Sequence, residues 1–192
     1  MIPVHIDREL VPFDLPVADV GELFAALAPR MRDRVLVSVV LNGWERIDPH
    51  DASGTSIPVE LVSEVWIETE SLAEALGRAL RSASALAIHA ASTATRAGEA
   101  FQGGRDAEGY LGFSELCGFA DSLAGLANAL PQLGAPRAHF DPFLDVWGVR
   151  CVPALAALVT AGEGKDVTLV ADHLLYDVAP AFEALGVSGS PT

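Results

Sequence analysis

The side chains that most often bind metals in proteins, histidine and cysteine, are not grouped in this sequence. The five histidines stand apart, and no Glu-x-x-His pair, His-Glu-x-x-His motif or Cys/His zinc spacing occurs. Cys117 and Cys151 lie far apart in segments with helical patterns, so we expect both thiols to be buried and inert. The sequence therefore predicts no metal centre, no bound cofactor and no disulfide framework.

Glycine and serine motifs that bind phosphate or supply a nucleophile are also missing. Gly103 and Gly104 are followed by Gly109 and Gly112, but the spacing is not that of a dinucleotide-binding loop. The Lys-Ser/Thr pair of a phosphate loop and the Gly-x-Ser-x-Gly motif of a hydrolase do not occur. We therefore interpret the glycine pair as a turn between helices.

The second half of the chain carries polar side chains that a site could use. Ligand pockets often lie between domains, so one hypothesis is an enzyme or small-molecule-binding protein with an interdomain pocket. Asp172 and His173 are neighbours, about 100° apart on a helix, and cannot form a local acid-base pair. The residues expected to line that pocket are His139, Asp141, Asp145 and Asp172.

A tryptophan offers a different kind of site. Trp44 follows Asn42-Gly43, a strong signal for a tight hairpin turn, where a side chain is at least partly exposed. An exposed tryptophan is a good anchor for a protein interface. The alternative is that Trp44 covers the edge of a small β core.

The charge of the chain limits its partners. It has 192 residues, with 12 basic and 26 acidic side chains and a net charge of -14 when histidine is neutral. This balance argues against nucleic acid and anionic membranes as partners. The N-terminus lacks the pattern of a signal peptide, and the uncharged stretches 82–95 and 122–136 are too short to span a bilayer. We expect a cytoplasmic protein.

The first 70 residues have the pattern of short strands around one helix. The continuous β-branched run at 35–41 is typical of a central strand buried on both faces. Residues 48–56 are turn formers and are expected to be the most exposed loop. The expected elements are a hairpin around residues 7–9, a helix at 17–28, a hairpin at 35–47 and extended segments at 57–61 and 65–67.

This segment resembles a β-grasp domain, the ubiquitin-like fold shared with sulfur-carrier proteins. The resemblance is carried by the opening hairpin, the helix at 17–28, VLVSVVLNGWERI at 35–47 and the closing VELVSEVWIET. It implies a small mixed sheet with one helix. Sulfur carriers end in a free Gly-Gly tail, whereas this chain continues through Glu68-Thr69-Glu70, so binding is implied rather than a carrier role.

From Ser71 onward the apolar residues follow a helical period. Ser71 and Glu74 have the spacing of a capping box, and Asp141-Pro142 is a favourable start for a later helix. Pro153 is expected to bend that later helix. Four helices joined by short turns predict an antiparallel four-helix bundle, so the fold class is α+β.

Glycines inside the second helix indicate close packing. Each costs a helix roughly 1 kcal/mol relative to alanine, so a close neighbour must offset the cost. Gly118 and Gly125 are one heptad apart and share a face. We predict that a helix of the same chain approaches this face. A second copy of the chain, forming a homodimer, is the alternative.

The helical part has a resemblance of its own. The segments at 100–126 and 163–186 are similar to uncharacterised bacterial proteins found with flagellar or motility genes, and the bundle resembles flagellin-type export chaperones in outline. The resemblance implies a non-enzymatic adaptor or chaperone-like protein that binds a protein partner, such as an amphipathic helical segment. The expected organisation is a β-grasp-like domain at 1–69, a bundle at 70–186 and a flexible tail at 187–192.

Overall fold

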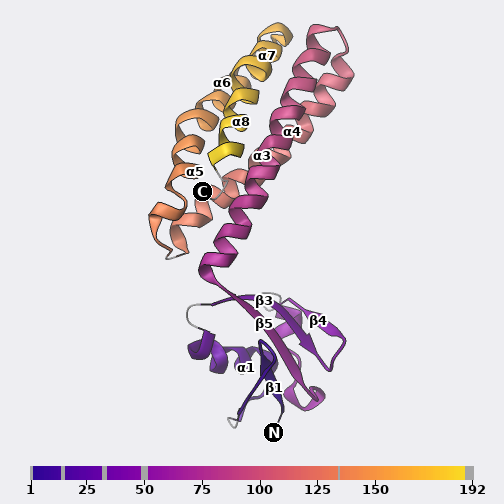
Figure 1. The fold of residues 1–192 in the computed structure, drawn as a ribbon. Coiled ribbons are helices and arrows are strands. Elements are labelled where there is room, and N and C mark those ends of the chain that lie inside the picture. The colour runs from indigo at the N-terminus through magenta and orange to yellow at the C-terminus, as the bar shows by residue number, and fades with distance from the viewer. Residues whose placement is uncertain (1, 14–15, 32–33, 49–51, 134, 189–192) are drawn as a thin grey trace. The chain divides into compact units, whose positions relative to one another are not determined.

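The structure is a computed structural model that describes residues 2–13, 16–31, 34–48, 52–133 and 135–188 (Figure 1). The chain forms two compact units, Met1–Ala75 and Leu76–Thr192, and each is described by itself. The sequence placed this boundary at 69/70. It also predicted a flexible tail at 187–192, but helix α8 continues through Ser188, and residues 189–192 lie outside the described part.

The first unit contains a mixed β-sheet, so the predicted α+β class is confirmed. The strand order is β2-β1-β5-β3-β4. Strand β1 is parallel to β5 and antiparallel to β2, and β3 is antiparallel to both β5 and β4. The strands are β1 (Val4–Ile6), β2 (Glu9–Val11), β3 (Arg34–Leu41), β4 (Glu45–Ile47) and β5 (Val65–Ser71).

Two turns with left-handed backbone form the hairpins of this sheet. Asp7 and Arg8 have φ values of 50° and 72°, and Asn42 and Gly43 have φ values of 55° and 76°. The second turn is closed by a hydrogen bond of 3.2 Å from the Trp44 amide to the Leu41 carbonyl. Paired positive φ values are the mark of the turn that best matches strand twist. The hairpin predicted at Asn42-Gly43 is therefore confirmed.

Helix α1 (Val20–Leu27) starts at a reciprocal cap and packs on one face of the sheet. Asp19 Oδ1 accepts from the Glu22 amide at 2.8 Å, and Glu22 Oε2 accepts from the Ala18 amide at 2.8 Å. This cap starts the helix three residues later than predicted, and a 3-10 segment, η1 (Ala28–Met31), follows it. The buried core of the unit is Val4, Phe13, Val20, Leu23, Leu27, Val39, Leu41, Val62, Val65 and Ile67.

The segment predicted as the most exposed loop contains regular structure. A short helix, α2, spans Ala52–Thr55, and a 3-10 segment, η2, spans Val59–Leu61. Backbone hydrogen bonds from Val20 to Ile57 and from Val59 to Ala18 join the end of this region to the start of α1. The expectation that 48–56 is the most exposed loop is not met at Gly54 and Thr55, which are half-buried, because Thr55 lies against Gly21 of α1. Residues 49–51 lie outside the described part.

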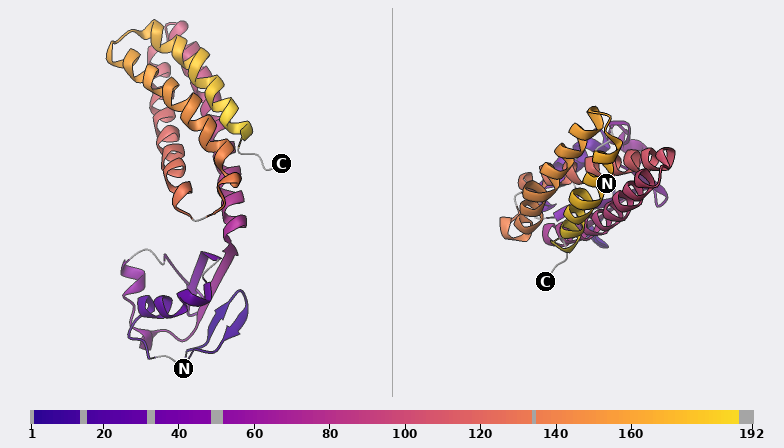
Figure 2. Two further views of the ribbon diagram at one scale, coloured as in Figure 1. Left: turned by 90° about the vertical axis from the view of Figure 1, so that its left-hand side faces the viewer. Right: turned by 90° about the horizontal axis from the view of Figure 1, so that it is seen from above.

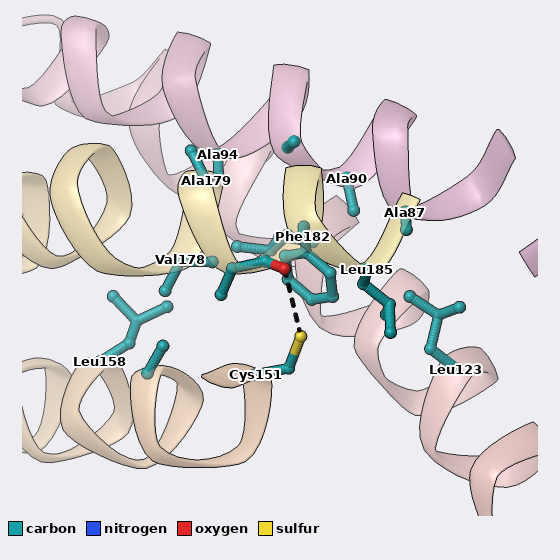
Figure 3. Close-up of a cluster of buried hydrophobic side chains, with 14 of the residues drawn as sticks. Ala87, Ala90, Ala94, Leu123, Cys151, Leu158, Val178, Ala179, Phe182 and Leu185 are labelled. Atoms are coloured by element: carbon teal, nitrogen blue, oxygen red, sulfur yellow. Dashed lines mark hydrogen bonds between the residues drawn. The ribbon is translucent and has the colours of Figure 1, made fainter. Parts of the chain in front are cut away.

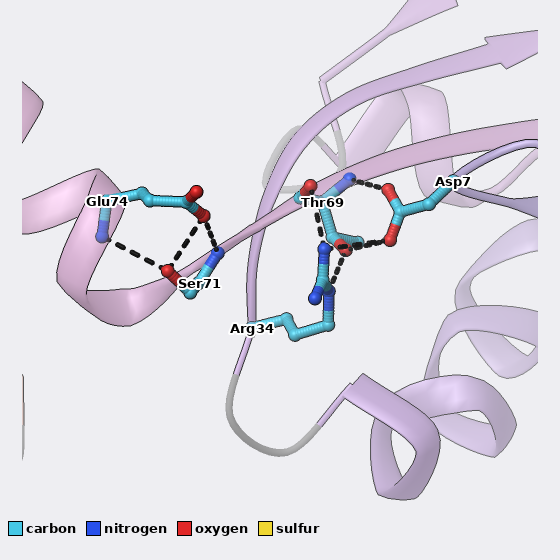
Figure 4. A network of polar contacts seen from close by, with 5 residues as sticks. All are labelled: Asp7, Arg34, Thr69, Ser71 and Glu74. Carbon is cyan, nitrogen blue, oxygen red and sulfur yellow. Dashed lines mark hydrogen bonds and ion pairs between the residues drawn. The ribbon is translucent and has the colours of Figure 1, made fainter.

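A polar network lies where β5 passes into helix α3 (Leu72–Gln102) (Figure 4). Asp7 accepts from the Thr69 amide at 2.7 Å and from the Thr69 hydroxyl at 2.7 Å, and Arg34 Nη2 lies 3.0 Å from Asp7 Oδ2. The predicted capping box is confirmed: the Ser71 amide donates to Glu74 Oε2 at 3.0 Å, and the Glu74 amide donates to Ser71 Oγ at 3.2 Å.

Acid should weaken the first unit through Asp7. Partial burial alone would raise the pKa of Asp7, but the Thr69 hydrogen bonds and the Arg34 charge lower it below 3.8. A depressed pKa adds stability that is complete above the ordinary pKa and is lost as pH falls through the folded-state value. We expect Asp7→Asn to lower the free energy of unfolding by about 1 kcal/mol or less at pH 7. This difference between the two chains should shrink towards pH 3.

Urea unfolding of a Trp147→Phe background measures this effect, since Trp44 and Trp66 then report on the first unit alone. Unfolding both chains at pH 7, 5 and 3 gives the free energy of unfolding of each. At each pH, the chain that keeps Asp7 is compared with the chain that carries Asp7→Asn. A difference that stays constant over this range would contradict the role given to the carboxylate.

The second unit is helical throughout most of its described length. Proline lacks an amide hydrogen, and a π-helical segment precedes both Pro153 and Pro180. The segments that follow α3 are α4 (Asp106–Ala129), η3 (Leu130–Gln132), η4 (Arg137–His139), α5 (Asp141–Val146), the π segment η5 (Trp147–Cys151), α6 (Val152–Glu163), α7 (Val167–His173), the π segment η6 (Leu174–Val178) and α8 (Ala179–Ser188).

Small residues of α3 bring the helices of this unit close together (Figures 2 and 3). Ala87, Ala90 and Ala94 are almost fully buried, and Figure 3 shows them beside Leu185, Phe182 and Ala179 of α8, respectively. Glycines permit the closest approaches: a Cβ on Gly109 would lie 2.7 Å from the Phe101 ring, and one on Gly112 would lie 2.9 Å from Ala97 Cβ. The same holds for Gly98 beside Leu175 and Gly186 beside Ile88.

Gly118 and Gly125 do not take part in this packing. Both are exposed on α4, and a Cβ on either would meet no atom of the described residues within 4 Å. The prediction that a helix of the same chain covers them is wrong. A heptad spacing shows that two glycines share a face, but it does not show whether that face is turned inward. The second-copy alternative stays a prediction.

The two kinds of glycine should respond oppositely to alanine. Gly118→Ala should stabilise the chain by roughly 0.5–1 kcal/mol, because it gains helix propensity in open space. Gly109→Ala should destabilise it by about 1–3 kcal/mol, because the new methyl group overlaps the Phe101 ring. Thermal unfolding followed by circular dichroism measures both. A stabilised Gly109→Ala chain would contradict the packing, and a lower mass for Gly118→Ala by light scattering would support the homodimer.

Candidate functional site

The four polar residues of the predicted pocket are not brought together. His139 ends η4, and Asp141 and Asp145 lie on α5. Asp172 lies on α7, with Oδ1 3.5 Å from Gln102 Nε2 at the end of α3. Figure 1 shows α5 and α7 towards opposite ends of the helical unit. The predicted cluster is therefore wrong. The helices are long enough to hold Asp172 far from the other three residues, and shared polarity in the sequence does not show spatial proximity.

Within the described residues, no group of three or more His, Cys, Asp or Glu side chains could hold a metal ion. One polar pair was missed by the sequence reasoning: His173 Nδ1 lies 2.6 Å from Asp177 Oδ2. The two residues are four apart on one helix, a spacing that places side chains together. The i, i+4 spacing that signals this pair is present in the sequence. Alone, the pair is a local ion pair beside η6.

The two cysteines differ, contrary to the prediction that both are buried. Cys151 is buried, and its thiol lies 3.5 Å from the Ala181 carbonyl oxygen, to which it donates (Figure 3). Burial raises the pKa of Cys151 to about 12, with a small opposing effect of Arg150. Cys117 is exposed, and partial burial together with the Asp121 charge raises its pKa. Neither thiol has the lowered pKa of a catalytic nucleophile.

An apolar pocket of about 400 Å³ lies near the turn between α6 and α7. Its volume is within the range of small-molecule pockets and of sites that take one large side chain. Glu163 and Lys165 are its charged lining residues, and Lys165 is the single lysine of the chain. We call it the end pocket, and its lining is completed by Phe101, Tyr110, Phe113, Cys117, Val159, Gly162, Val167 and Val170.

An exposed apolar stripe leads along the same helix to this pocket. Val149 is 75% exposed and Val159 is 54% exposed, and Val152 and Ala156 between them are also exposed. The spacings of three, four and three residues keep such side chains on one side of a helix. We call these four residues the α6 face. Val159 also lines the end pocket, so the α6 face and the pocket form one apolar surface.

This helical stretch is unusually apolar for one that is so exposed. Asp141–Glu163 is long and apolar enough, by length and composition, to cross a membrane, a property that buried core helices share. Here, however, only 22% of its most apolar window is buried in the structure. The absence of a long uncharged stretch hides this feature in the sequence, because Arg150 interrupts it. Exposed apolar surface of this extent is typical of a binding site.

A second hollow of the helical unit is lined by charged side chains. The groove between α3 and α4, of about 570 Å³, is lined by Arg96, Arg105, Glu108 and Glu115. Arg105 pairs with Glu108 at 2.8 Å, and Arg96 lies 3.9 Å from Glu115. The positive and negative charges of this groove largely offset one another. The groove therefore has no excess of either sign that would favour an anionic or a cationic ligand.

Trp44, the predicted interface anchor of the first unit, is 78% exposed at the tip of the β3–β4 hairpin. Such exposure rules out the alternative in which the ring covers the core edge.

Comparisons of the chain with protein-family models, with curated proteins and with solved structures found no match. Both resemblances stated from the sequence therefore stay predictions, and the function is argued from the surfaces themselves.

Thiol labelling should distinguish the two cysteines. The native chain should react with one equivalent of a neutral maleimide, at Cys117, because Cys151 is buried and its pKa is about 12. The second equivalent should react only in denaturant. Cys117→Ser should leave the native chain unlabelled, as judged by intact mass. Rapid labelling of both cysteines in the native chain would contradict the placement of Cys151.

Proposed function

We propose that the chain is a non-enzymatic protein-binding adaptor, and that its helical unit binds an apolar helix of a partner along the α6 face. The observation that carries this proposal is the continuity of the exposed α6 face with the end pocket through Val159. A helix laid on the face would bury Val149, Val152 and Ala156, and one large side chain of the partner would enter the pocket. This is helix recognition by spaced anchor residues.

The dimensions suit such a partner. From Val149 to Val159 the helix rises by about 15 Å at roughly 1.5 Å per residue. A partner helix of about three turns covers that length and presents apolar side chains at three- and four-residue spacing. An aromatic or leucine side chain fits the end pocket, whose volume is about 400 Å³. Filling a desolvated pocket with such an anchor is how interface hot spots contribute most of their energy.

A protein fits this surface better than a bilayer does. Arg150 is exposed next to Val149, and Asp145 and Glu163 lie near the two ends of the stripe. Placing these charges at the level of lipid tails costs several kcal/mol. The net charge of -14 also disfavours anionic lipid. A protein groove, in contrast, can leave the charges at a wet rim while it covers the valines.

The finer fold assignments belong to the same proposal. The strand order β2-β1-β5-β3-β4, with β1 parallel to β5 and α1 on one face, supports a β-grasp fold for the first unit. The shared core of α3, α4, α6 and α8 supports an antiparallel four-helix bundle for the second. With the resemblance to export chaperones, these features support an adaptor of the bacterial cytoplasm.

A small apolar molecule is the second candidate for the end pocket. The observation that favours it is the lining, in which Phe101, Tyr110 and Phe113 contribute aromatic rings and Lys165 a charge at the rim. In that case the ligand would be held by the pocket alone, and the α6 face beyond Val159 would be dispensable. The two candidates therefore differ in whether Val149 and Val152 matter.

Selection of displayed helical peptides on the full-length chain tests the proposal. Enriched peptides should carry an apolar face with one large anchor. Val152→Glu should weaken their binding by about 10-fold or more, since it introduces a charge where a valine would be buried. Val187→Glu is the matched control, because Val187 is 76% exposed on α8, a helix that contributes no residue to the α6 face, and it should leave binding within twofold.

Three outcomes would overturn the helix-binding function. The first is that the enriched peptides bind the Val152→Glu chain with the same affinity as the unchanged chain. The second is that Val152→Glu and Val187→Glu weaken peptide binding equally. The third is that the chain binds neutral lipid vesicles and that Val152→Glu abolishes this binding, since this would assign the face to a membrane. Circular dichroism melts of each variant ensure that the comparison is made between folded chains.

A further inference from the structure

One residue from each of the five strands forms a continuous row across the sheet. The pairing register places Leu10 of β2 opposite His5 of β1, and His5 opposite Trp66 of β5. Trp66 in turn lies opposite Val40 of β3, and Val40 opposite Arg46 of β4. Residues in direct register share one face of a sheet. We call these five residues the cross-sheet row.

The cross-sheet row lies on the face of the sheet opposite the core. Side chains alternate along a strand, and the neighbours of the row are buried: Val4 beside His5, Val65 and Ile67 on either side of Trp66, and Val39 and Leu41 on either side of Val40. The row itself is turned to solvent, with Leu10 64% exposed and Trp66 37% exposed. The face that α1 covers and the face that carries the row are therefore distinct.

The centre of the row is rigid and aromatic. The rings of His5 and Trp66 are stacked, with centroids 3.9 Å apart and planes 5° apart. Stacking between neighbouring strands fixes both rings before any partner arrives, so little side-chain entropy remains to be lost on binding. A large, pre-ordered aromatic surface with an aliphatic neighbour on each side, Leu10 and Val40, has the composition of an interface anchor.

The β4 end of the row is basic, since Arg46 is exposed there, whereas the charge that follows Trp66 on the same face of β5 is acidic. Glu68 is exposed two residues after Trp66, which places it on the same face about 7 Å along the strand. Residues 1–70 contain 13 acidic and five basic side chains. One of the five, Arg34, is paired with Asp7 at 3.0 Å. A partner that brings positive charge beside an apolar anchor is therefore complementary to this face, and an anionic one is repelled.

We propose that the cross-sheet row is a docking surface for a basic amphipathic helix of a partner protein. A helix laid along the row would place its apolar side on Trp66, and because a helix is about 10–12 Å wide, a Lys or Arg on its flank would lie close to Glu68, to one side of the row. The surface lies in the first unit and shares no residue with the α6 face, so it gives the adaptor a second partner and does not depend on the first.

Two synthetic 18-residue amphipathic helices test this proposal. Both have the same apolar face, and their polar faces carry only Lys and Gln or only Glu and Gln. Titration into the full-length Trp44→Phe/Trp147→Phe chain uses Trp66 as the single fluorescent reporter. The Lys helix should bind and change Trp66 emission, and the Glu helix should bind at least 10-fold more weakly. Binding of the Lys helix should weaken as salt is raised from 50 to 500 mM.

Matched surface variants distinguish docking from general attraction to an acidic protein. Leu10→Ser and Glu68→Gln should each weaken the Lys helix at least threefold. Their controls, Leu61→Ser and Glu60→Gln, make the same changes on η2, where Leu61 is 68% exposed, and should leave binding within 1.5-fold. Equal effects of the two sets, equal binding of the two helices, or no binding of the Lys helix would each overturn the proposal.

Discussion

The helical unit depends on how closely small side chains let its helices approach. Alanines of α3 lie against Phe182 and Leu185 of α8, and Gly109 and Gly112 of α4 lie against α3 with no room for another methyl group. A core of this kind is filled by backbone and methyl groups together with a few large side chains from one partner helix. Its stability therefore depends on fit, and even one added carbon at Gly109 or Gly112 disturbs it.

Close packing of this kind has a consequence for the rest of the surface. The alanine side of α3 needs few large apolar residues from its neighbours, and Val149 of η5 and Val152 and Val159 of α6 are left exposed. Exposed valines lower solubility and do not stabilise the folded chain by itself. A partner that covers them, as proposed, would remove their apolar surface from water. The end pocket extends that surface inward between α4 and the α6–α7 turn, where an anchor can be held.

In the first unit, strand register has the corresponding role. Five short strands place Leu10, His5, Trp66, Val40 and Arg46 side by side, although they are scattered over the first 66 residues. The parallel pairing of β1 with β5 brings the His5 and Trp66 rings into contact. Two surfaces on separate units, one apolar and the other apolar with Glu68 beside it, fit the proposed adaptor with two different partners.

Local signals in the sequence determined the elements whose causes are local. The Asn42-Gly43 turn, the Ser71–Glu74 capping box and the change from strands to helices near residue 70 all follow from short-range hydrogen bonding and periodicity. Only the tertiary structure decided which face of each element is covered. Gly118 and Gly125 have the same spacing in the sequence whether a helix packs on them or water does. The exposure of α6, the separation of Asp172 from Asp141 and the row through Trp66 likewise depend on contacts between distant segments, since burial is a property of neighbours that no single segment contains.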